Sequence, residues 1–329
     1  MLLHTASLPR QSPISPVDTP PAELRGRQGR SGTTIHGWRA VVFGVPFAGA
    51  GAFLVLLALG LVGDVDQGRN APLWVVLPVG VLFAIVGLLL VAHGASGVAR
   101  RRRTEGFRRK FPGQPWAWDH RWTVGGSTDE TGSEIARSLV TGSVVALFLV
   151  PFHWVGFVSP DGPVAFAVLS LLFDAVVALV LGRAAYLAIR RARFGWRTLR
   201  FARFPFLTGE TLEASLDRRG ALGDVRALTA TLRCVQERYE TRGVGRNRAQ
   251  QVVCYELWSN TRTVEAAGQA SFHFTFPIPP DAQGTALGER PARYWELDVT
   301  SGDVPGVDFA ATFLVPVYAS GGRLRFAAL

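Results

Sequence analysis

Four long apolar runs lie within the first two-thirds of this 329-residue chain. Each run is about 20 residues long with almost no charge, the length that a helix needs to cross a hydrocarbon core of about 30 Å. A buried helix of a soluble protein would show a polar face, and these runs show none. The sequence therefore predicts four transmembrane helices, at about 38–62, 72–92, 139–158 and 163–189.

Basic residues are distributed unevenly around these runs. Arginines gather before the first run, between the second and third, and after the fourth, whereas the short connections at 64–70 and 159–162 hold Arg69 alone. Loops rich in arginine and lysine stay on the cytoplasmic side of a membrane. We therefore expect both termini and the long middle loop, 94–137, to lie in the cytoplasm.

The net charge of +10 would ordinarily suggest a nucleic-acid partner. However, Lys110 is the only lysine, and the arginines cluster at the ends of apolar runs, where membrane topology requires them. Together with abundant Ala, Gly and Val, this bias is more typical of a GC-rich bacterial genome than of a phosphate-binding surface. We therefore expect a bacterial inner-membrane protein in contact with the lipid bilayer, without a nucleic-acid partner.

Two polar segments flank the first two runs. Residues 1–36 are rich in Pro, Ser, Thr, Gly and Arg and have no apolar period, which predicts a disordered N-terminal tail. In the middle loop, tryptophans beside arginines predict an anchor on the inner leaflet, with the rings at headgroup depth. A ligand site and lipid recognition by the arginines are the alternatives. The five residues concerned are Arg108, Arg109, Trp116, Trp118 and Trp122.

From about residue 194 the apolar period changes to two, as expected of β-strands. Residues 228–234, 272–278 and 295–299 alternate apolar and polar side chains, and Gly- and Pro-rich turns separate these stretches. Clean alternation is typical of antiparallel sheets with one solvated face. The sequence therefore predicts an all-β antiparallel sandwich over 194–329, after a four-helix membrane domain over 37–193.

Several motifs in this region resemble a known group. The run FHFTFPIPPDAQGT, then RYWELDVTS and VPGVDFAATFLVPVY, is similar to the C-terminal part of uncharacterised bacterial four-span membrane proteins, and that part resembles arrestin-like or Ig-like sandwiches. The loop PGQPWAWDHRW and the exit RRARFGWRTLRFARFP extend the resemblance to about residues 100–329. It implies an architecture and supplies no catalytic residue. Arrestin-like sandwiches generally act as adaptors and scaffolds.

The chain shows no pattern of a known catalytic site. It contains no GxSxG, HExxH, Walker A or CxxC motif, and its six histidines have no metal-ligand spacing. We therefore expect no enzymatic activity, no metal and no cofactor.

Asp174 is the one charged residue in the middle of the fourth run. A carboxylate at the bilayer centre costs about 2.5–3.5 kcal/mol on translocon scales, so it normally faces a bundle interior or a cavity. His153 is its best candidate partner, but an axial offset of about 7 Å means that a direct pair requires tilted helices. The alternative is a neutral Asp174 bonded to Ser170 or to a backbone carbonyl.

The two cysteines lie in a predicted hairpin. Cys234 and Cys254 are symmetric about Val244 in the intervening loop, so we expect them to be cross-strand neighbours. The prediction is a pair of free, partly buried thiols, because cytoplasmic thiols stay reduced. A redox switch is the alternative.

Two functions follow from these expectations. In the first, the cytoplasmic sandwich is an adaptor or scaffold module that binds a protein or peptide partner. In the second, the chain is a small transporter or channel subunit with Asp174 in the membrane path. Small residues at spacings of three and four in the first two runs favour close helix packing, within the bundle or in a homo-oligomer.

Overall fold

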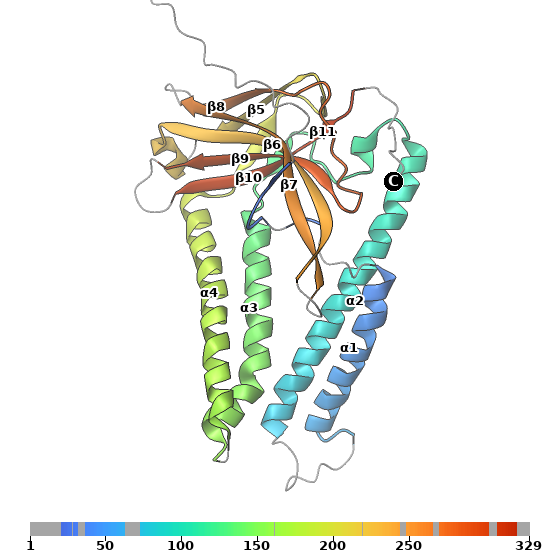
Figure 1. Ribbon diagram of the computed structural model, residues 1–329, viewed down its shortest axis with the longest axis vertical. Helices are drawn as coiled ribbons and strands as arrows, with labels where there is room; N and C mark the ends of the chain where they lie inside the picture. Colours follow the sequence, from blue (N-terminus) through green and yellow to red (C-terminus); the bar gives the residue numbers. More distant parts are fainter. Residues whose placement is uncertain are drawn as a thin grey trace, which may run out of the picture.

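The computed structural model describes residues 21–27, 29–31, 37–62, 73–160, 162–218, 220–243, 248–265, 270–302 and 308–320. Long helices form one half of the molecule, and the strands gather at one end of them (Figure 1). The helices are α1 (Trp38–Ala58), α2 (Leu73–Lys110), α3 (Thr131–His153), continued by a π-helical turn (Trp154–Val158), and α4 (Val164–Phe194). Each is long and apolar enough to cross a membrane. The prediction of four membrane-spanning helices is confirmed at this level.

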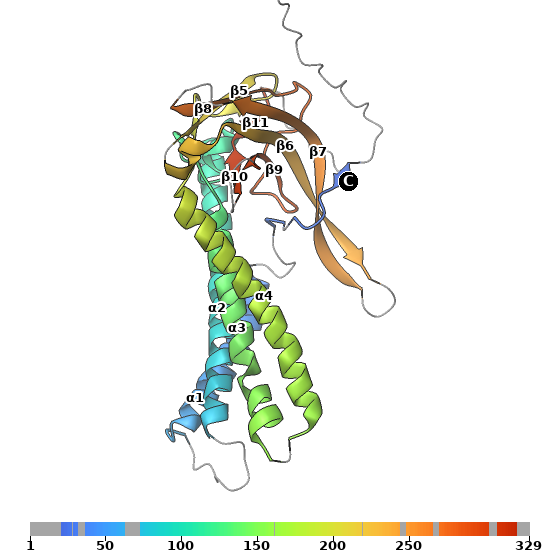
Figure 2. The ribbon, with the colours of Figure 1, turned by 90° about the vertical axis from the view of Figure 1, so that its left-hand side faces the viewer.

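Small residues let α1 and α2 pack closely, and the two helices run side by side in both views (Figures 1 and 2). A Cβ atom added to Gly51 would lie 2.1 Å from the backbone nitrogen of Ala84. One added to Gly87 would lie 2.2 Å from the backbone nitrogen of Ala48. Backbones approach this closely only where side chains are missing. The small residues therefore pack within this helix pair, as predicted.

Two helices, α2 and α4, are longer than a hydrocarbon core is thick. α2 has 38 residues and is about 57 Å long, nearly twice the thickness of a hydrocarbon core. The expected loop at 94–137 is therefore wrong at both ends, since α2 continues to Lys110 and α3 already begins at Thr131. Arginines are good helix formers, so the basic stretch after the apolar run prolongs the helix instead of ending it.

The β-domain consists of two antiparallel sheets and a short parallel pair. The five-stranded sheet has the order β1-β7-β6-β9-β10, and the four-stranded sheet has the order β2-β3-β5-β8. The strands are β1 (Ala22–Glu23), β2 (Gly126–Thr128), β3 (Thr198–Phe201), β4 (Phe206–Leu207), β5 (Thr211–Asp217), β6 (Ala227–Arg242), β7 (Ala249–Glu265), β8 (Ser271–Pro277), β9 (Arg293–Ser301), β10 (Phe309–Val315) and β11 (Val317–Tyr318). The predicted antiparallel β-domain is confirmed.

The main core lies between the two sheets. The apolar residues that alternate in the sequence are buried there, among them Leu232 on β6, Phe274 on β8 and Leu297 on β9. Burial of this set is the main source of stability of such a sandwich. The period-two pattern therefore assigned the inward faces correctly.

The sandwich also recruits chain from outside 194–329. β1 pairs with β7, and β2 pairs with β3, so the domain begins before the first helix. The outer face of the five-stranded sheet is only partly solvated, since Tyr294 lies in a second apolar cluster with Leu24 and Trp122 packed against it. The predicted start of the domain at residue 194 therefore leaves out β1 and β2. The predicted solvated outer face is solvated only in part.

The α1–α2 contact yields a test with an internal control. Gly51→Ala should destabilise the chain by about 1–3 kcal/mol, because the added methyl group overlaps the backbone of α2. Gly49→Ala has open space at the same Cβ position, so it should be neutral or stabilising. Thermal unfolding of the full chain in detergent distinguishes the two. Equal melting temperatures would contradict the close packing of the two helices.

Candidate functional site

An N-terminal segment, residues 21–31 without Gln28, lies along the edge and outer face of the five-stranded sheet. Ala22 pairs with Glu256 on β7, and the Leu24 amide donates a hydrogen bond of 2.9 Å to the Cys254 carbonyl. The prediction of a disordered tail is wrong for this part, and residues 1–20 lie outside the described residues. Backbone hydrogen bonds and the packing of Leu24 hold this segment on the sheet. The segment is therefore ordered although its sequence has no apolar period.

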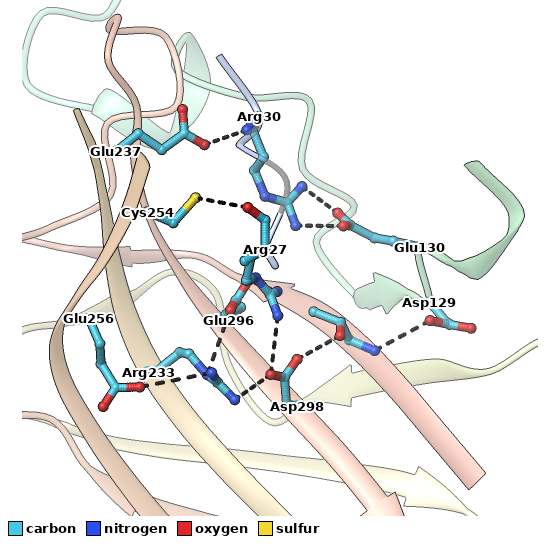
Figure 3. Close-up of polar contacts among 11 residues, drawn as sticks. Arg27, Arg30, Asp129, Glu130, Arg233, Glu237, Cys254, Glu256, Glu296 and Asp298 are labelled. Carbon is cyan, nitrogen blue, oxygen red and sulfur yellow. Dashed lines mark hydrogen bonds and ion pairs between the residues drawn. The ribbon is translucent and has the colours of Figure 1, made fainter. Parts of the chain in front are cut away.

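Arg27 carries this segment into a group of carboxylates on the sheet (Figure 3). It forms ion pairs with Glu296, whose side chain is fully buried, and with Asp298 at 3.3 Å. Arg233 of β6 lies 2.5 Å from Asp298 on the other side. Strand alternation explains the arrangement, because Arg233 and Glu296 are cross-strand partners on the same face.

The pKa of the Glu296 carboxyl is shifted towards neutral pH. Burial raises the pKa of this carboxyl to about 7, although the positive charge of Arg27 opposes the shift. Near neutral pH, the residue therefore exchanges between a carboxylate that pairs with Arg27 and a neutral acid.

A second anchor fixes the end of the segment. The two terminal guanidinium nitrogens of Arg30 each lie 2.5 Å from a carboxylate oxygen of Glu130, directly before α3. The Ser31 amide donates a hydrogen bond of 2.9 Å to Glu237, and the Ser31 hydroxyl accepts one of 2.9 Å from the Ala292 amide. The segment thus links the start of α3 to the sandwich.

A cavity of about 350 Å³ lies beside these ion pairs, between the sheet and the ends of α3 and α4 that face the β-domain. Asp298 and Glu130 form part of its wall, together with Asp129 and Arg190. Oδ1 of Asp129 accepts hydrogen bonds from the amides of Thr131, at 3.3 Å, and Thr312, at 3.4 Å. The wall therefore contains groups of both charges.

The tryptophan loop packs on the sandwich. Nε1 of Trp122 donates a hydrogen bond of 2.8 Å to the hydroxyl of Tyr318, and the ring of Trp116 meets Tyr318 edge-on at 6.0 Å. The predicted anchor in the leaflet is therefore wrong for these rings. The cause is the length of α2, which carries the loop about 24 Å beyond Gly94, near the end of the α1–α2 contact.

The other three predicted anchor residues are also accounted for. Arg108 lies over the ring of Trp118, with its guanidinium carbon 5.2 Å from the ring centre, and Trp118 is half-buried. Arg109 is exposed near the end of α2. For these three residues the anchor stays a prediction.

Asp119, in the same loop, is a structural residue that the sequence did not single out. It accepts hydrogen bonds from the amides of Leu287, at 2.9 Å, and Gly288, at 2.5 Å, and from the hydroxyl of Tyr318, at 3.2 Å. Burial raises the pKa of this carboxyl, although the three donors oppose the shift. Asp119 thereby ties the loop to the sandwich.

The two cysteines are not neighbours. Cys254 pairs with Glu237 and Cys234 with Trp258. Arg242 is opposite Ala249, three residues beyond the position that symmetry about Val244 requires, and a β-bulge between Cys234 and Val235 shifts the register by one further residue. Cys234 belongs to the core between the sheets and Cys254 to the outer cluster, so their side chains point apart and cannot form a disulfide. The predicted register is wrong and the redox switch is excluded. Burial raises the thiol pKa of Cys234 to about 12 and of Cys254 to about 11.

In the membrane half, His153 and Asp174 form a direct pair between α3 and α4. Nε2 of His153 lies 2.9 Å from Oδ2 of Asp174, and Nδ1 lies 2.9 Å from the Leu149 carbonyl oxygen. A carbonyl can only accept, so Nδ1 carries a proton and the contact to Asp174 needs a second, shared proton. Ser170 is buried and its hydroxyl has no partner in the described chain, so the alternative bond to Asp174 is absent.

The described residues contain no group of three His, Cys, Asp or Glu side chains that could hold a metal ion. No protein-family model matches the chain, and no curated protein matches it. Among solved structures, the sporulation control protein Spo0M from Bacillus subtilis is similar at 14% identity and a TM-score of 0.25, over 37% of this chain and 48% of that one. The chain thus spans about half the length of Spo0M. A likeness at this level assigns neither fold nor function, and the arrestin-like resemblance stays a prediction.

The ion pair at the sheet predicts a large effect of Arg27. Arg27→Ala leaves Glu296 buried without its main partner and should destabilise the chain by about 3 kcal/mol. Arg25→Ala, on the exposed side of the same segment, is the matched control and should change stability by less than about 0.5 kcal/mol. Thermal unfolding in detergent measures both. Equal effects would show that the segment is not held by this ion pair.

Glu296 also predicts a pH dependence. Its pKa is higher in the folded chain than in the unfolded chain, so the folded state binds the proton more tightly. The stability that this group contributes is complete below about pH 4.5 and is lost as the pH rises to about 7. Melting temperatures between pH 5 and 7.5 should therefore fall more steeply for the wild type than for Glu296→Gln. Parallel curves would contradict the raised pKa.

Proposed function

We propose that this chain is an integral inner-membrane protein of a bacterium that displays a cytoplasmic β-sandwich as an adaptor module. The open edge of β7 is the observation that carries the proposal. β7 pairs with β6 from Ala249 to Glu265, whereas β1 covers its other edge only at Tyr255 and Glu256. From residue 257 to 265, that edge has no strand partner among the described residues.

An unpaired edge of this length presents a row of free backbone amides and carbonyls. An extended peptide can add to such an edge as a further strand, with backbone hydrogen bonds for affinity and side-chain pockets for specificity. β1 already demonstrates this mode of binding, because the N-terminal segment pairs with the same strand. The partner we propose is therefore a protein with an extended segment. Neither catalysis nor nucleic-acid binding forms part of the proposal.

The arginine distribution supports a cytoplasmic sandwich. The N-terminal segment, the loop after α2 and the strands after α4 lie at the same end of the helices, as four spans require (Figure 2). These are the arginine-rich parts of the chain. An alkaline phosphatase fused to the C-terminus should be inactive; an active fusion would place the sandwich outside the cytoplasm.

The His153–Asp174 pair favours a second candidate function. Ionisable residues inside a membrane often belong to proton or ion pathways. A shared proton between two helices, next to a π-helical turn, is the kind of element such a pathway uses. On this view the chain is a small transporter or channel subunit.

Substitutions in the two halves separate the candidates. Successive residues of a strand direct their amides to opposite edges, so Thr261→Pro and Arg262→Pro each remove a donor from a different edge of β7. The variant that removes an amide bonded to β6 should lower the melting temperature. The variant that removes an amide on the open edge should leave the melting temperature unchanged. It should still abolish the co-purification of partners from cross-linked native membranes.

Asp174→Asn is the matched change in the membrane half. On the adaptor proposal, it should rescue a deletion strain as well as the wild type does, and the outward-facing proline variant should fail. If Asp174→Asn fails and the proline variant rescues, the transport function replaces the adaptor function.

A further inference from the structure

The cavity between the sheet and the ends of α3 and α4 leaves one cation and one carboxylate without a charged partner. Three of its four carboxylates have one: Glu130 pairs with Arg30, Glu134 with Arg183 at 3.5 Å, and Asp298 with the two arginines described above. Of these four carboxylates, Asp129 is the one that forms no ion pair with a described residue.

Asp129 uses only part of its hydrogen-bonding capacity. Its Oδ1 accepts both of its hydrogen bonds from backbone amides, and its Oδ2 has no donor among the described residues. The side chain is half-buried in the wall of the cavity. A carboxylate oxygen in this position can accept a hydrogen bond from a ligand cation.

Arg190 is the complementary group. Its guanidinium donates a hydrogen bond of 3.3 Å to the Thr131 hydroxyl and forms no ion pair within the described part of the chain. The first turn of α3, with Thr131 and Glu134, lines the cavity beside it. A guanidinium next to a helix N-terminus is a favourable environment for an anion.

With the start of α4 taken as the far edge of the hydrocarbon core, helix length places the cavity at the level of the lipid headgroups. Arg190 is 26 residues after Val164, where α4 begins, which corresponds to about 39 Å along the helix. With the usual tilt of about 20°, Arg190 stands about 7 Å beyond a hydrocarbon core of about 30 Å. The headgroup layer on each side is about 5–7 Å thick. The exposed ring of Trp196, stacked on Arg191 at 3.2 Å, is consistent with this depth.

We propose that this cavity binds a phosphoethanolamine group, with the phosphate against Arg190 and the ammonium against Asp129. The two charges of this group are separated by a short carbon chain and match one free cation and one free carboxylate in the same cavity. A primary ammonium donates three hydrogen bonds, and the threonine hydroxyls of the wall are further acceptors. The source of the group is a membrane lipid or a soluble phosphoethanolamine.

Binding of short-chain lipids to the full chain in detergent tests the proposal. Dihexanoyl phosphatidylethanolamine should raise the melting temperature in a saturable way. Phosphatidylcholine has no ammonium hydrogen to donate, and phosphatidylglycerol has no ammonium, so both should bind at least about tenfold more weakly. O-phosphoethanolamine distinguishes the sources: displacement of the lipid indicates a soluble ligand, and no displacement indicates a lipid. Both outcomes support the assigned chemistry.

Variants assign the two charges. Arg190→Gln should weaken binding of the ethanolamine lipid about tenfold or more, and Arg190→Lys should restore part of the loss. Asp129→Asn keeps the Oδ1 acceptor and should remove the preference over phosphatidylcholine. Arg193→Gln, exposed at the same helix end and outside the cavity, is the control and should bind normally. Each variant's melting temperature without lipid reports its folding.

Two results would overturn the proposal. One is equal stabilisation by all three lipids, which would mean that the ammonium makes no specific contact. The other is undiminished binding of the ethanolamine lipid by both Arg190→Gln and Arg190→Lys, which would place the phosphate elsewhere.

Discussion

The difference between helix length and membrane thickness determines how the rest of this molecule is arranged. A hydrocarbon core of about 30 Å needs about 20 helical residues, whereas α2 has 38 and α4 has 31. The sandwich is attached to one end of these helices (Figure 2). The tryptophan loop at the end of α2 thereby reaches the sandwich and packs on Tyr318.

Carboxylates on the outer face of the five-stranded sheet connect the two halves. Arg27 and Arg30 reach them from the segment that precedes α1, and Glu130 belongs to the loop that leads into α3. The ion pairs therefore join sheet, N-terminal segment and membrane helices at one place (Figure 3). Because Glu296 has a pKa of about 7, the strength of this junction depends on pH in the neutral range.

The candidate sites were only partly predictable. His153 and Asp174 could be paired from the sequence because few ionisable residues occur within the apolar runs. Glu296 and Asp298 were visible only as the polar side of a strand. Their role depends on Arg27, more than 260 residues away in the sequence, and a local sequence pattern cannot predict a contact over that separation.

The sequence alone determined the elements whose cause is local or periodic. Apolar length defined the four spans, and period-two alternation identified inward-facing residues such as Phe274 and Leu297. Tertiary structure decided which segments meet. The pairing of Arg242 with Ala249 set the hairpin register, the N-terminal segment was ordered by partners in distant strands, and the tryptophan loop packed on the sandwich. These outcomes depend on contacts between residues far apart in the chain. The energy of such a contact depends on both segments together, so neither segment's sequence predicts it alone.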